Sequence, residues 1–281
     1  MDFSVITPSY NYGRYIGQCL ESVARQQGAT FEHLVMDAGS TDQTAEVVSG
    51  FPHVSFFQEP DKGMSDAINK GFLKAKGRWV MWLNADDFLL PDALRKVLAC
   101  IARNPAADVV FGTYRIVDTH GAPVRTMKLL PYSRFVSVHY GCYVPSTATF
   151  LKRARTIAEG FVLDERMRTV MDNEYYARLS LAGRKFVYAP QLLAAFRVHQ
   201  ENLSCVGGVK RGTLTDELAY ANMGTETEAI RRTYGVTLFG NTIFNHALDF
   251  LLYFLAWGLK GVMKLPYWFA TGVSSRHSAS L

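Results

Sequence analysis

The 281 residues are 48% hydrophobic and 20% charged, which excludes a disordered chain and fits one large α/β domain with an appendage. The net charge of +5 suits polyanionic partners such as nucleotide diphosphates or anionic lipids, and no segment resembles a nucleic-acid-binding motif. The four cysteines have no paired spacing, so neither a zinc site nor a disulfide framework is predicted, and we expect no secretion signal.

The first forty residues predict two strands separated by a helix. Residues 3–7 form a short β-branched run that ends at the turn-forming residues 8–11. Apolar residues then recur at helical spacing over residues 15–23, and residues 31–37 form a second strand. This alternation predicts an open, mostly parallel sheet that binds ligands at the carboxyl ends of its strands.

The second predicted strand ends in a polar loop. Asp37 closes the strand, where both a ligand-binding role and a plain turn role suit an aspartate. Ser40 and Thr41 precede a helix that we expect to begin near Asp42. Either hydroxyl is a suitable N-cap for that helix.

An apolar run over residues 79–83 ends, after Asn84, on the adjacent carboxylates Asp86 and Asp87. Two like charges side by side repel each other, so we expect either a cation or a solvated loop at this point. At the carboxyl edge of an α/β sheet the pair suits a divalent metal that carries phosphates. The alternative is a polar turn before the next helix, because Pro91 follows closely.

The second half of the chain predicts further strands and one helix with an acidic start. Strands are expected over residues 108–112, 114–117, 145–151 and 185–195. Residues 171–179 have the spacing of a helix whose buried face carries Tyr175, Tyr176 and Leu179. Asp172 opens this helix, and its carboxylate is a candidate N-cap.

Four ordered motifs resemble the family 2 glycosyltransferases, which are inverting enzymes of the GT-A fold. They are SVITPSYN at residues 4–11, MDAGSTD at 36–42, DKGMSDAINKG at 61–71 and LNADD at 83–87. The resemblance implies a GT-A (Rossmann-like) nucleotide-sugar-binding domain with a mostly parallel central sheet. It would cover residues 1–205, with a nucleotide-binding half to about residue 115 and an acceptor half beyond it. Residues 206–281 would be a helical C-terminal extension.

The resemblance also implies which residues bind the nucleotide sugar. The loop after the first strand and the aspartate after the second would hold the base and ribose, and a tyrosine ring suits stacking on a pyrimidine. The DKG segment would border the same pocket, and two residues of the helix after it would face the phosphates or the sugar. The implied donor-binding residues are Pro8, Tyr10, Asn11, Asp37, Asp61, Lys62, Gly63, Asp66, Asn69 and Arg197.

The metal and the catalytic base are implied in the same way. Asp86 would coordinate Mn²⁺ or Mg²⁺, Asp87 would support it, and His199 would complete the metal shell or touch the diphosphate. Asn84 replaces the first carboxylate of the Asp-Ala-Asp pattern found in many relatives, which weakens the expected affinity for the ion. Asp172 matches the acid that serves as catalytic base.

The C-terminal tail carries an unbroken apolar run over residues 250–259, followed by lysines and aromatic residues. The run is shorter than the roughly 18 residues of a membrane-spanning helix. It predicts a helix in the membrane interface, with Trp257 and Trp268 at the level of the headgroups. The alternative is a helix packed on the catalytic domain or on a second subunit.

Together these patterns predict an inverting glycosyltransferase of cell-surface polysaccharide biosynthesis. A nucleotide sugar, with UDP the expected carrier, would donate to a glycan or polyprenyl-linked acceptor on the cytoplasmic face of the membrane. Asp172 would deprotonate the acceptor hydroxyl, and a metal at Asp86 would stabilise the departing diphosphate. The alternatives are a nucleotidyltransferase and a catalytically silent, membrane-associated assembly factor.

Overall fold

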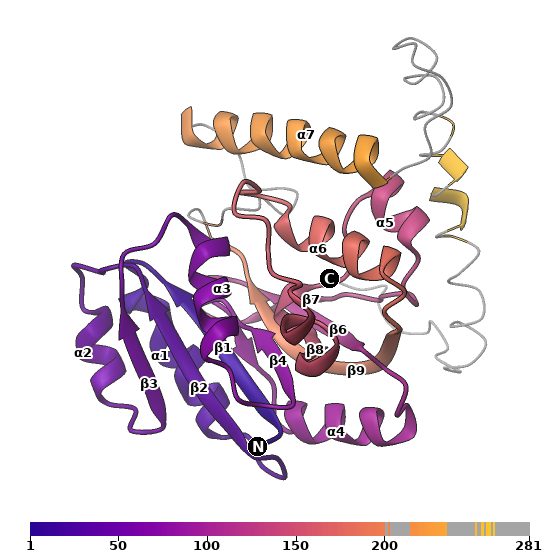
Figure 1. The fold of residues 1–281 in the computed structure, drawn as a ribbon. Helices are drawn as coiled ribbons and strands as arrows, with labels where there is room; N and C mark the ends of the chain where they lie inside the picture. Colours follow the sequence, from indigo (N-terminus) through magenta and orange to yellow (C-terminus); the bar gives the residue numbers. More distant parts are fainter. Residues whose placement is uncertain are drawn as a thin grey trace, which may run out of the picture.

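The computed structural model describes residues 1–199, 202 and 214–234, together with residues 251, 254, 255, 257–259 and 261. Within 214–234, side chains are described from residue 223 onward. The described residues form an α/β domain around one mixed sheet, with a long C-terminal helix lying beside it (Figure 1). The predicted α/β class is therefore confirmed.

The N-terminal half builds a parallel sheet from alternating strands and helices. β1 (Phe3–Ser9) pairs in parallel with β2 (Phe31–Asp37) and β4 (Trp79–Trp82), and β2 pairs with β3 (Val54–Gln58). The helices between them are α1 (Gly13–Ala24), α2 (Thr44–Ser49) and α3 (Met64–Lys74). Because β1 lies between β2 and β4, the loops that follow these three strands meet at one edge of the sheet.

The C-terminal half extends the sheet with antiparallel strands around one long parallel pair. β8 pairs antiparallel with β4 and β6, and β9 pairs parallel with β6 and antiparallel with β5. The helical elements are α4 (Ala93–Arg103), α5 (Arg134–Tyr140), α6 (Met171–Leu181) and α7 (Leu214–Tyr234), with short 3₁₀ turns at Ser146–Ala148, Arg153–Arg155 and Ile157–Glu159. The strands are β5 (Phe88–Leu89), β6 (Val109–Val117), β7 (Pro123–Thr126), β8 (Thr149–Lys152) and β9 (Phe186–Arg197).

The hydrophobic core lies on both faces of the sheet, because successive side chains of a strand point to opposite sides. Val5 belongs to the cluster that packs against α1 and α4, whereas its neighbour Ile6 belongs to the cluster formed with α3 and α6. Tyr175 and Tyr176 of α6 are fully buried in the second cluster, as the helical spacing predicted. The core therefore holds α6 firmly against the sheet while its first turn reaches the sheet edge.

Helix α7 packs on α5 and α6. Ile230 is fully buried in a small apolar cluster with Val138 of α5 and Ala177 of α6. The predicted domain boundary at residue 205 lies between α6 and α7 in the sequence. In the structure α7 nevertheless packs on α5 and α6, which belong to the predicted catalytic domain. The expected helical character of the extension agrees with this helix.

Two strand predictions differ from the structure. Residues 109–117 form the single strand β6 instead of two strands. The pairing register with β9 shifts at Gly112 and Thr113, and the strand continues through this point. Residues 145–151 begin with a 3₁₀ turn over Ser146–Ala148, and only then does β8 start at Thr149.

The predicted cap of α2 is also wrong. The helix begins at Thr44 with Gln43 at its N-cap position, so Ser40 and Thr41 lie too early to cap it. Asp42 instead accepts hydrogen bonds from the backbone nitrogen and the hydroxyl of Thr44. A carboxylate two residues before the helix therefore satisfies the first turn.

The described part of the C-terminal tail has helical backbone at residues 251, 254, 255, 257–259 and 261. Five large apolar side chains there are between 46% and 61% exposed: Leu251, Phe254, Leu255, Trp257 and Leu259. Trp268 and the lysines of the predicted interface helix lie outside the described residues. Across the described part of the chain, no helix is long and apolar enough to cross a membrane.

Candidate active site

The loop after β2 is built around the carboxylate of Asp37. Its Oδ1 atom accepts hydrogen bonds from the backbone nitrogens of Gly39 (3.0 Å) and Ser40 (2.8 Å), and its Oδ2 accepts one from the Ser40 hydroxyl (2.5 Å). The side chain of Gln58 donates to Oδ1 at 3.3 Å. Asp37 thus shapes a tight turn at the carboxyl end of the strand, and this geometry suits the turn role and leaves the ligand role as a proposal.

The loop after β1 is tied to this turn through Asn11. The Asn11 side chain accepts a hydrogen bond from the backbone nitrogen of Thr41 at 2.8 Å, and its own backbone nitrogen donates to the Ser40 hydroxyl at 2.8 Å. Asn11 has a φ of 57°, a conformation that asparagine adopts more readily than most residues. Pro8 is buried within β1, whereas the ring of Tyr10 is 57% exposed at the rim of the two joined loops.

The DKG segment forms a second compact turn that leads into α3. Asp61 accepts a hydrogen bond from the backbone nitrogen of Gly63 (2.8 Å), and Asp66 accepts one from Lys62 (3.0 Å). Gly63 has a φ of 130°, and a Cβ atom there would collide with the guanidinium of Arg168. The segment therefore requires glycine at position 63.

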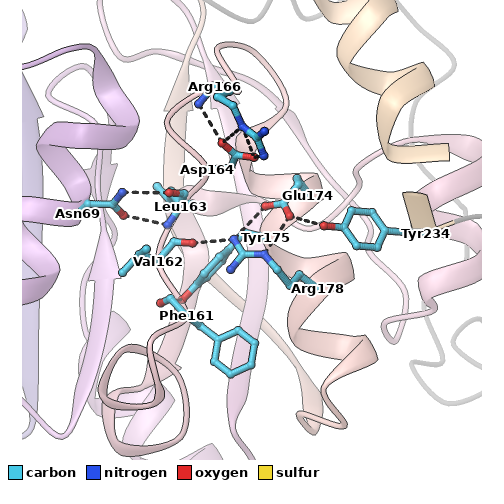
Figure 2. A network of polar contacts seen from close by, with 10 residues as sticks. All are labelled: Asn69, Phe161, Val162, Leu163, Asp164, Arg166, Glu174, Tyr175, Arg178 and Tyr234. Atoms are coloured by element: carbon cyan, nitrogen blue, oxygen red, sulfur yellow. Dashed lines mark hydrogen bonds and ion pairs between the residues drawn. The ribbon is translucent and has the colours of Figure 1, made fainter. Parts of the chain in front are cut away.

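Asn69 lies on α3 but points away from the turn before it. Its amide nitrogen donates to the carbonyl of Leu163 (3.0 Å), and its amide oxygen accepts from the backbone nitrogen of Leu163 (2.8 Å), as Figure 2 shows. Both ends of this buried amide are used in holding the loop before α6. We therefore leave Asn69 out of the residues proposed to contact the donor.

The two adjacent carboxylates lie in a turn after β4. The strand ends at Trp82, and the backbone nitrogen of Asp87 donates to the carbonyl of Asn84 at 3.0 Å. Asp86 is only 6% exposed, so the expectation of a solvated loop is wrong at this point. Its Oδ2 atom lies 2.9 Å from Nε2 of His199 and accepts a hydrogen bond from Asn202 at 3.2 Å.

Asp87 is buried beside Asp86. Burial, together with the neighbouring charge of Asp86, raises the pKa of Asp87 well above its usual range. Its Oδ1 accepts a hydrogen bond from the backbone nitrogen of Arg197 at 3.0 Å. Among the described residues, Oδ2 of Asp87 and Oδ1 of Asn84 have no hydrogen bond of good geometry, although the Thr147 hydroxyl lies near enough to Asp87 to lower its pKa. Two oxygens at this turn are thus buried without the donors that a closed structural turn would supply.

This donor set fits a divalent cation. The 2.9 Å between Oδ2 of Asp86 and Nε2 of His199 is close to the roughly 3.0 Å that separates adjacent ligands at metal bonds of about 2.1 Å. No group of three or more histidine, cysteine, aspartate or glutamate side chains gathers among the described residues. Mg²⁺ commonly binds through only one or two carboxylates plus water and substrate phosphates, so the carboxylate of Asp86 with few further protein ligands is enough.

The side chain of Arg197 is enclosed by the protein. It is 2% exposed, and its guanidinium donates to the carbonyls of Asp86 (2.8 Å) and Thr119 (3.0 Å) and to the side chain of Gln18 (2.5 Å). The same group lies over the ring of Tyr15 at 5.2 Å. These contacts fix the turn that carries Asp86, and we assign Arg197 this structural role in place of diphosphate binding.

Replacing Arg197 by lysine is expected to lower the free energy of unfolding by about 3 kcal/mol, because a lysine cannot satisfy three separate buried acceptors. Thermal or urea unfolding would measure this loss. Arg103→Lys is the matched control, since Arg103 lies on the exposed face of α4 and donates to the carbonyl of Ala99 within its own helix. A stability of Arg197→Lys equal to that of the control would contradict the structural role.

Asp172 lies on the first turn of α6. The helix begins at Met171 and its N-cap is Val170, so the prediction that Asp172 is the N-cap is wrong. The side chain is half-buried, and burial raises the pKa of its carboxyl group to about 6. The thiol of Cys142 lies within hydrogen-bonding reach of it. A carboxylate with a pKa near neutrality is suited to accept a proton.

Tyr114 of β6 connects the two halves of the site, and the sequence pattern did not single it out. Burial raises the pKa of its phenol to about 12, with smaller contributions from Cys142, Asp87 and Asp172. The charges of Asp87, in the turn after β4, and of Asp172, on α6, both raise this pKa. Tyr114 appeared in the sequence only as the first residue of a predicted strand, and no local motif marked it.

Comparisons with known proteins place the chain among sugar-transferring enzymes. The family model described as "Glycosyl transferase family 2" matches residues 4–158. A PGL/p-HBAD biosynthesis glycosyltransferase of Mycobacterium tuberculosis is 37% identical over 116 residues, which are 39% of this chain and 45% of that protein. The chondroitin synthase of Escherichia coli is 28% identical over 205 residues, 72% of this chain and 29% of the synthase. The chain thus spans less than half of the length of these curated relatives.

Solved structures show the same fold. TarS of S. aureus in complex with UDP superposes with a TM-score of 0.59 at 23% identity, covering 70% of this chain and 61% of TarS. The mannosyltransferase PcManGT of Pyrobaculum calidifontis, in complex with GDP-Man and Mn²⁺, gives a TM-score of 0.63 at 18% identity, covering 97% of this chain and 76% of that protein. The predicted GT-A-like architecture is confirmed by this likeness. With four ordered motifs, this fold and a family match over more than half of its length, the chain belongs to glycosyl transferase family 2.

Proposed function

We propose that the protein transfers a sugar, with inversion, from a nucleotide-sugar donor to a hydroxyl group of a glycan or polyprenyl-linked acceptor. The observation that supports this most directly is the pairing of two chemically different groups in one domain. Asp86 and His199 offer metal ligands at the end of β4, and Asp172 offers a carboxylate of raised pKa on α6. The charges of Asp87, beside Asp86, and of Asp172 both raise the pKa of the Tyr114 phenol. The family favours the same assignment.

The donor would bind over the loops that follow β1 and β2. The exposed ring of Tyr10 is placed to stack on a base, and the turn held by Asp37 and Asn11 gives a rigid floor beneath it. The DKG segment would border the same pocket at Asp61, with Lys62 and Asp66 able to approach the phosphates. TarS and PcManGT are described with UDP, UDP-GlcNAc or GDP-Man, which favours a nucleotide diphosphate sugar here, with UDP as the expected carrier.

Asp86 and His199 would hold a divalent ion, Mn²⁺ or Mg²⁺, with Asp87 in support. The ion would supply positive charge to the diphosphate as its bond to the sugar breaks. The protein holds these ligands in place through the buried guanidinium of Arg197, which binds the carbonyl of Asp86. With a metal ion bound at Asp86 and His199, the positive charge beside the diphosphate would come from the ion, and no lysine or arginine side chain would be needed for it.

Asp172 would accept the proton of the acceptor hydroxyl while the hydroxyl oxygen attacks the anomeric carbon. The bond from that carbon to the diphosphate oxygen breaks in the same displacement, so the configuration inverts without a covalent intermediate on the enzyme. A pKa near 6 leaves most of the carboxyl groups ionised at neutral pH and still basic enough to receive the proton.

A thermal-shift series tests the proposed donor. UDP, GDP, dTDP and their sugars would be added with and without Mn²⁺, since a ligand that binds only the native state raises the melting temperature by mass action. A ligand at a hundred times its Kd should add about 2.7 kcal/mol of stability. We expect the largest shift with UDP and Mn²⁺ together. The absence of any shift with every nucleotide, with or without metal, would contradict the proposal.

We also propose that the protein associates with the cytoplasmic face of the membrane through its C-terminal tail. The exposed side chains of Leu251, Phe254 and Trp257 are apolar, and lysines follow them in the sequence. Such a surface would place the catalytic domain beside a polyprenyl-linked acceptor.

Deleting the residues after position 241 is expected to release the protein from vesicles that contain anionic lipids, because the apolar run and its lysines are removed. Vesicle flotation and UDP affinity would be measured on the full chain and the truncated chain. Retention of the truncated chain on vesicles would place the anchor elsewhere. A change in oligomeric state would instead favour a helix that packs against a second subunit.

A further inference from the structure

The segment that leads into α6 is held by a carboxylate from α7. Oε1 of Glu226 accepts a hydrogen bond from the backbone nitrogen of Arg168 at 2.7 Å. Its Oε2 accepts three more, from the backbone nitrogen (2.9 Å) and hydroxyl (2.8 Å) of Thr169 and from the backbone nitrogen of Val170 (3.1 Å). Glu226 thus binds the three residues that lead directly into α6.

This contact supplies what the local sequence lacks. The N-cap residue of α6 is Val170, whose side chain cannot accept a hydrogen bond, and no side-chain cap is present at this helix start. The backbone nitrogens before a helix need acceptors, and a negative charge at this end also favours the helix dipole. Glu226 accepts from the backbone nitrogen of Val170 and brings a negative charge to this end of the helix, although it lies 56 residues away in the chain.

The segment that Glu226 binds also touches the donor side of the site. The guanidinium of Arg168 donates to the carbonyl of Lys62 at 2.5 Å, beside the glycine that requires this close approach. The hydroxyl of Ser65, on the first turn of α3, lies 2.9 Å from the sulfur of Met171. Residues 168–171 therefore connect the DKG segment with the turn that carries Asp172.

A second contact fixes α7 against the same helix. The hydroxyl of Tyr234 donates to Glu174 at 2.6 Å, and Glu174 also binds the guanidinium of Arg178 (Figure 2). Ile230 is buried between these polar contacts. Helix α7 thus contacts α6 through Ile230 and Tyr234 and the segment before α6 through Glu226, and Figure 1 shows α7 beside α6.

We propose that Glu226 is a positioning residue that holds Asp172 in register with the donor-side segment 61–63. The proposal rests on the role of Asp172 given under the proposed function. On this proposal α7 is needed for catalysis, because the carboxylate that holds the segment before α6 comes from this helix. The base and the donor segment then keep their relative position as long as α7 stays docked.

Glu226→Gln tests this role with little change in shape. A glutamine has only one acceptor oxygen. Its amide nitrogen would therefore face one or more of the backbone N–H groups that donate to Glu226, and those hydrogen bonds would be lost. We expect kcat for transfer to fall by about tenfold to a hundredfold, since a displacement of about 1 Å at a reacting group costs about this much. Affinity for UDP should stay near that of the wild type, because the loops after β1 and β2 are untouched.

The pH profile separates positioning from loss of folding. The Cys142 thiol lies within hydrogen-bonding reach of Asp172, the charge of Asp172 acts on the phenols of Tyr114 and Tyr176, and burial raises the pKa of Asp172 itself. A loosened first turn admits water, which lowers the pKa of Asp172. The acidic limb of the kcat/KM profile should therefore move to lower pH. A variant that is only less stable would lose active protein without moving this limb.

Glu228→Gln is the matched control on the same helix, where the carboxylate pairs with Arg232 at the surface. It should keep the wild-type kcat and profile. Thr169→Val, which removes a single donor to Glu226, should give an intermediate loss and serves if Glu226→Gln folds poorly. A wild-type kcat in Glu226→Gln, or a loss that merely follows the folded fraction with an unmoved acidic limb, would overturn the proposal.

The variant Asp172→Asn distinguishes failure of this inference from failure of the proposed function. If Asp172→Asn retains transfer, the assignment of the base is wrong whatever Glu226 does. If Asp172→Asn loses most of its transfer activity, the residual rate of the double variant Asp172→Asn, Glu226→Gln should equal that of Asp172→Asn alone. A residue that acts only through Asp172 has no further effect once Asp172 is replaced. A further loss in the double variant would assign Glu226 a role independent of Asp172.

Discussion

Asp172→Asn is expected to reduce sugar transfer by roughly a hundredfold to ten-thousandfold, the range of contributions measured for general bases. Asparagine has the same size as aspartate but cannot accept the proton of the acceptor hydroxyl. Val170, not Asp172, is the N-cap of α6, so the substitution removes no cap. The melting temperature and the affinity for the nucleotide sugar should therefore stay close to those of the wild type. Slow hydrolysis of the donor would persist, because the departure of the diphosphate does not depend on Asp172.

The pH dependence of transfer provides a second measurement on the same residue. Because the pKa of Asp172 is raised to about 6, the ionised base is lost as the pH falls through that value. The kcat/KM profile of the wild type should therefore have an acidic limb near pH 6, well above the usual aspartate value of about 3.9. This limb should be absent from the residual activity of Asp172→Asn. A limb near pH 4 in the wild type would contradict the raised pKa of this carboxyl group.

The neighbouring acids supply the controls. Asp164 forms a salt bridge with Arg166, and Glu174 binds Arg178 and Tyr234, so both carboxylates are already committed within the protein (Figure 2). Asp164→Asn should keep most of the transfer rate. If it lost transfer while Asp172→Asn kept it, the base would have to be reassigned to Asp164.

The sequence predicted the elements that depend on local patterns. The strand over residues 31–37 was located to the residue, because the apolar stretch Leu34, Val35 and Met36 ends abruptly on Asp37. The adjacent carboxylates were placed correctly at the edge of the sheet, after β4. Their burial was not foreseen, because it depends on Arg197 and His199, which arrive from more than a hundred residues further along the chain.

Partners that are distant in sequence account for most of the differences. Ser40 was expected to cap a helix, but its hydroxyl instead donates to Asp37, three residues earlier, and closes a turn. Asn69 was expected to face the donor, but a loop 94 residues later takes both ends of its amide. Glu226 had no signal at all, because a glutamate on a polar helix looks the same whether or not a backbone segment lies against it.

Asp86→Asn is expected to lower transfer by about two orders of magnitude, equivalent to about 3 kcal/mol, because an amide is a much weaker ligand for a hard divalent cation than a carboxylate. We prefer asparagine to alanine here because Asp86 is buried and its carboxylate has two contacts. It accepts a hydrogen bond from Asn202 and lies against Nε2 of His199. Alanine would leave a cavity and remove the carboxylate that contacts the His199 imidazole. Asparagine keeps the volume and one acceptor oxygen, so the fold should survive.

Binding of the metal supplies a measurement that is independent of turnover. In the presence of UDP, Mn²⁺ should raise the melting temperature of the wild type and not that of Asp86→Asn, because only the former offers a charged ligand at this turn. Asp92→Asn is the matched control: Asp92 is a half-buried acid six residues away that pairs with Arg95, and it has a positive φ that asparagine also tolerates. Full transfer by the wild type in excess EDTA would show that the buried pair of Asp86 and His199 serves the fold and not the ion. An Mn²⁺-induced rise in melting temperature that is equal in the wild type and in Asp86→Asn would show the same.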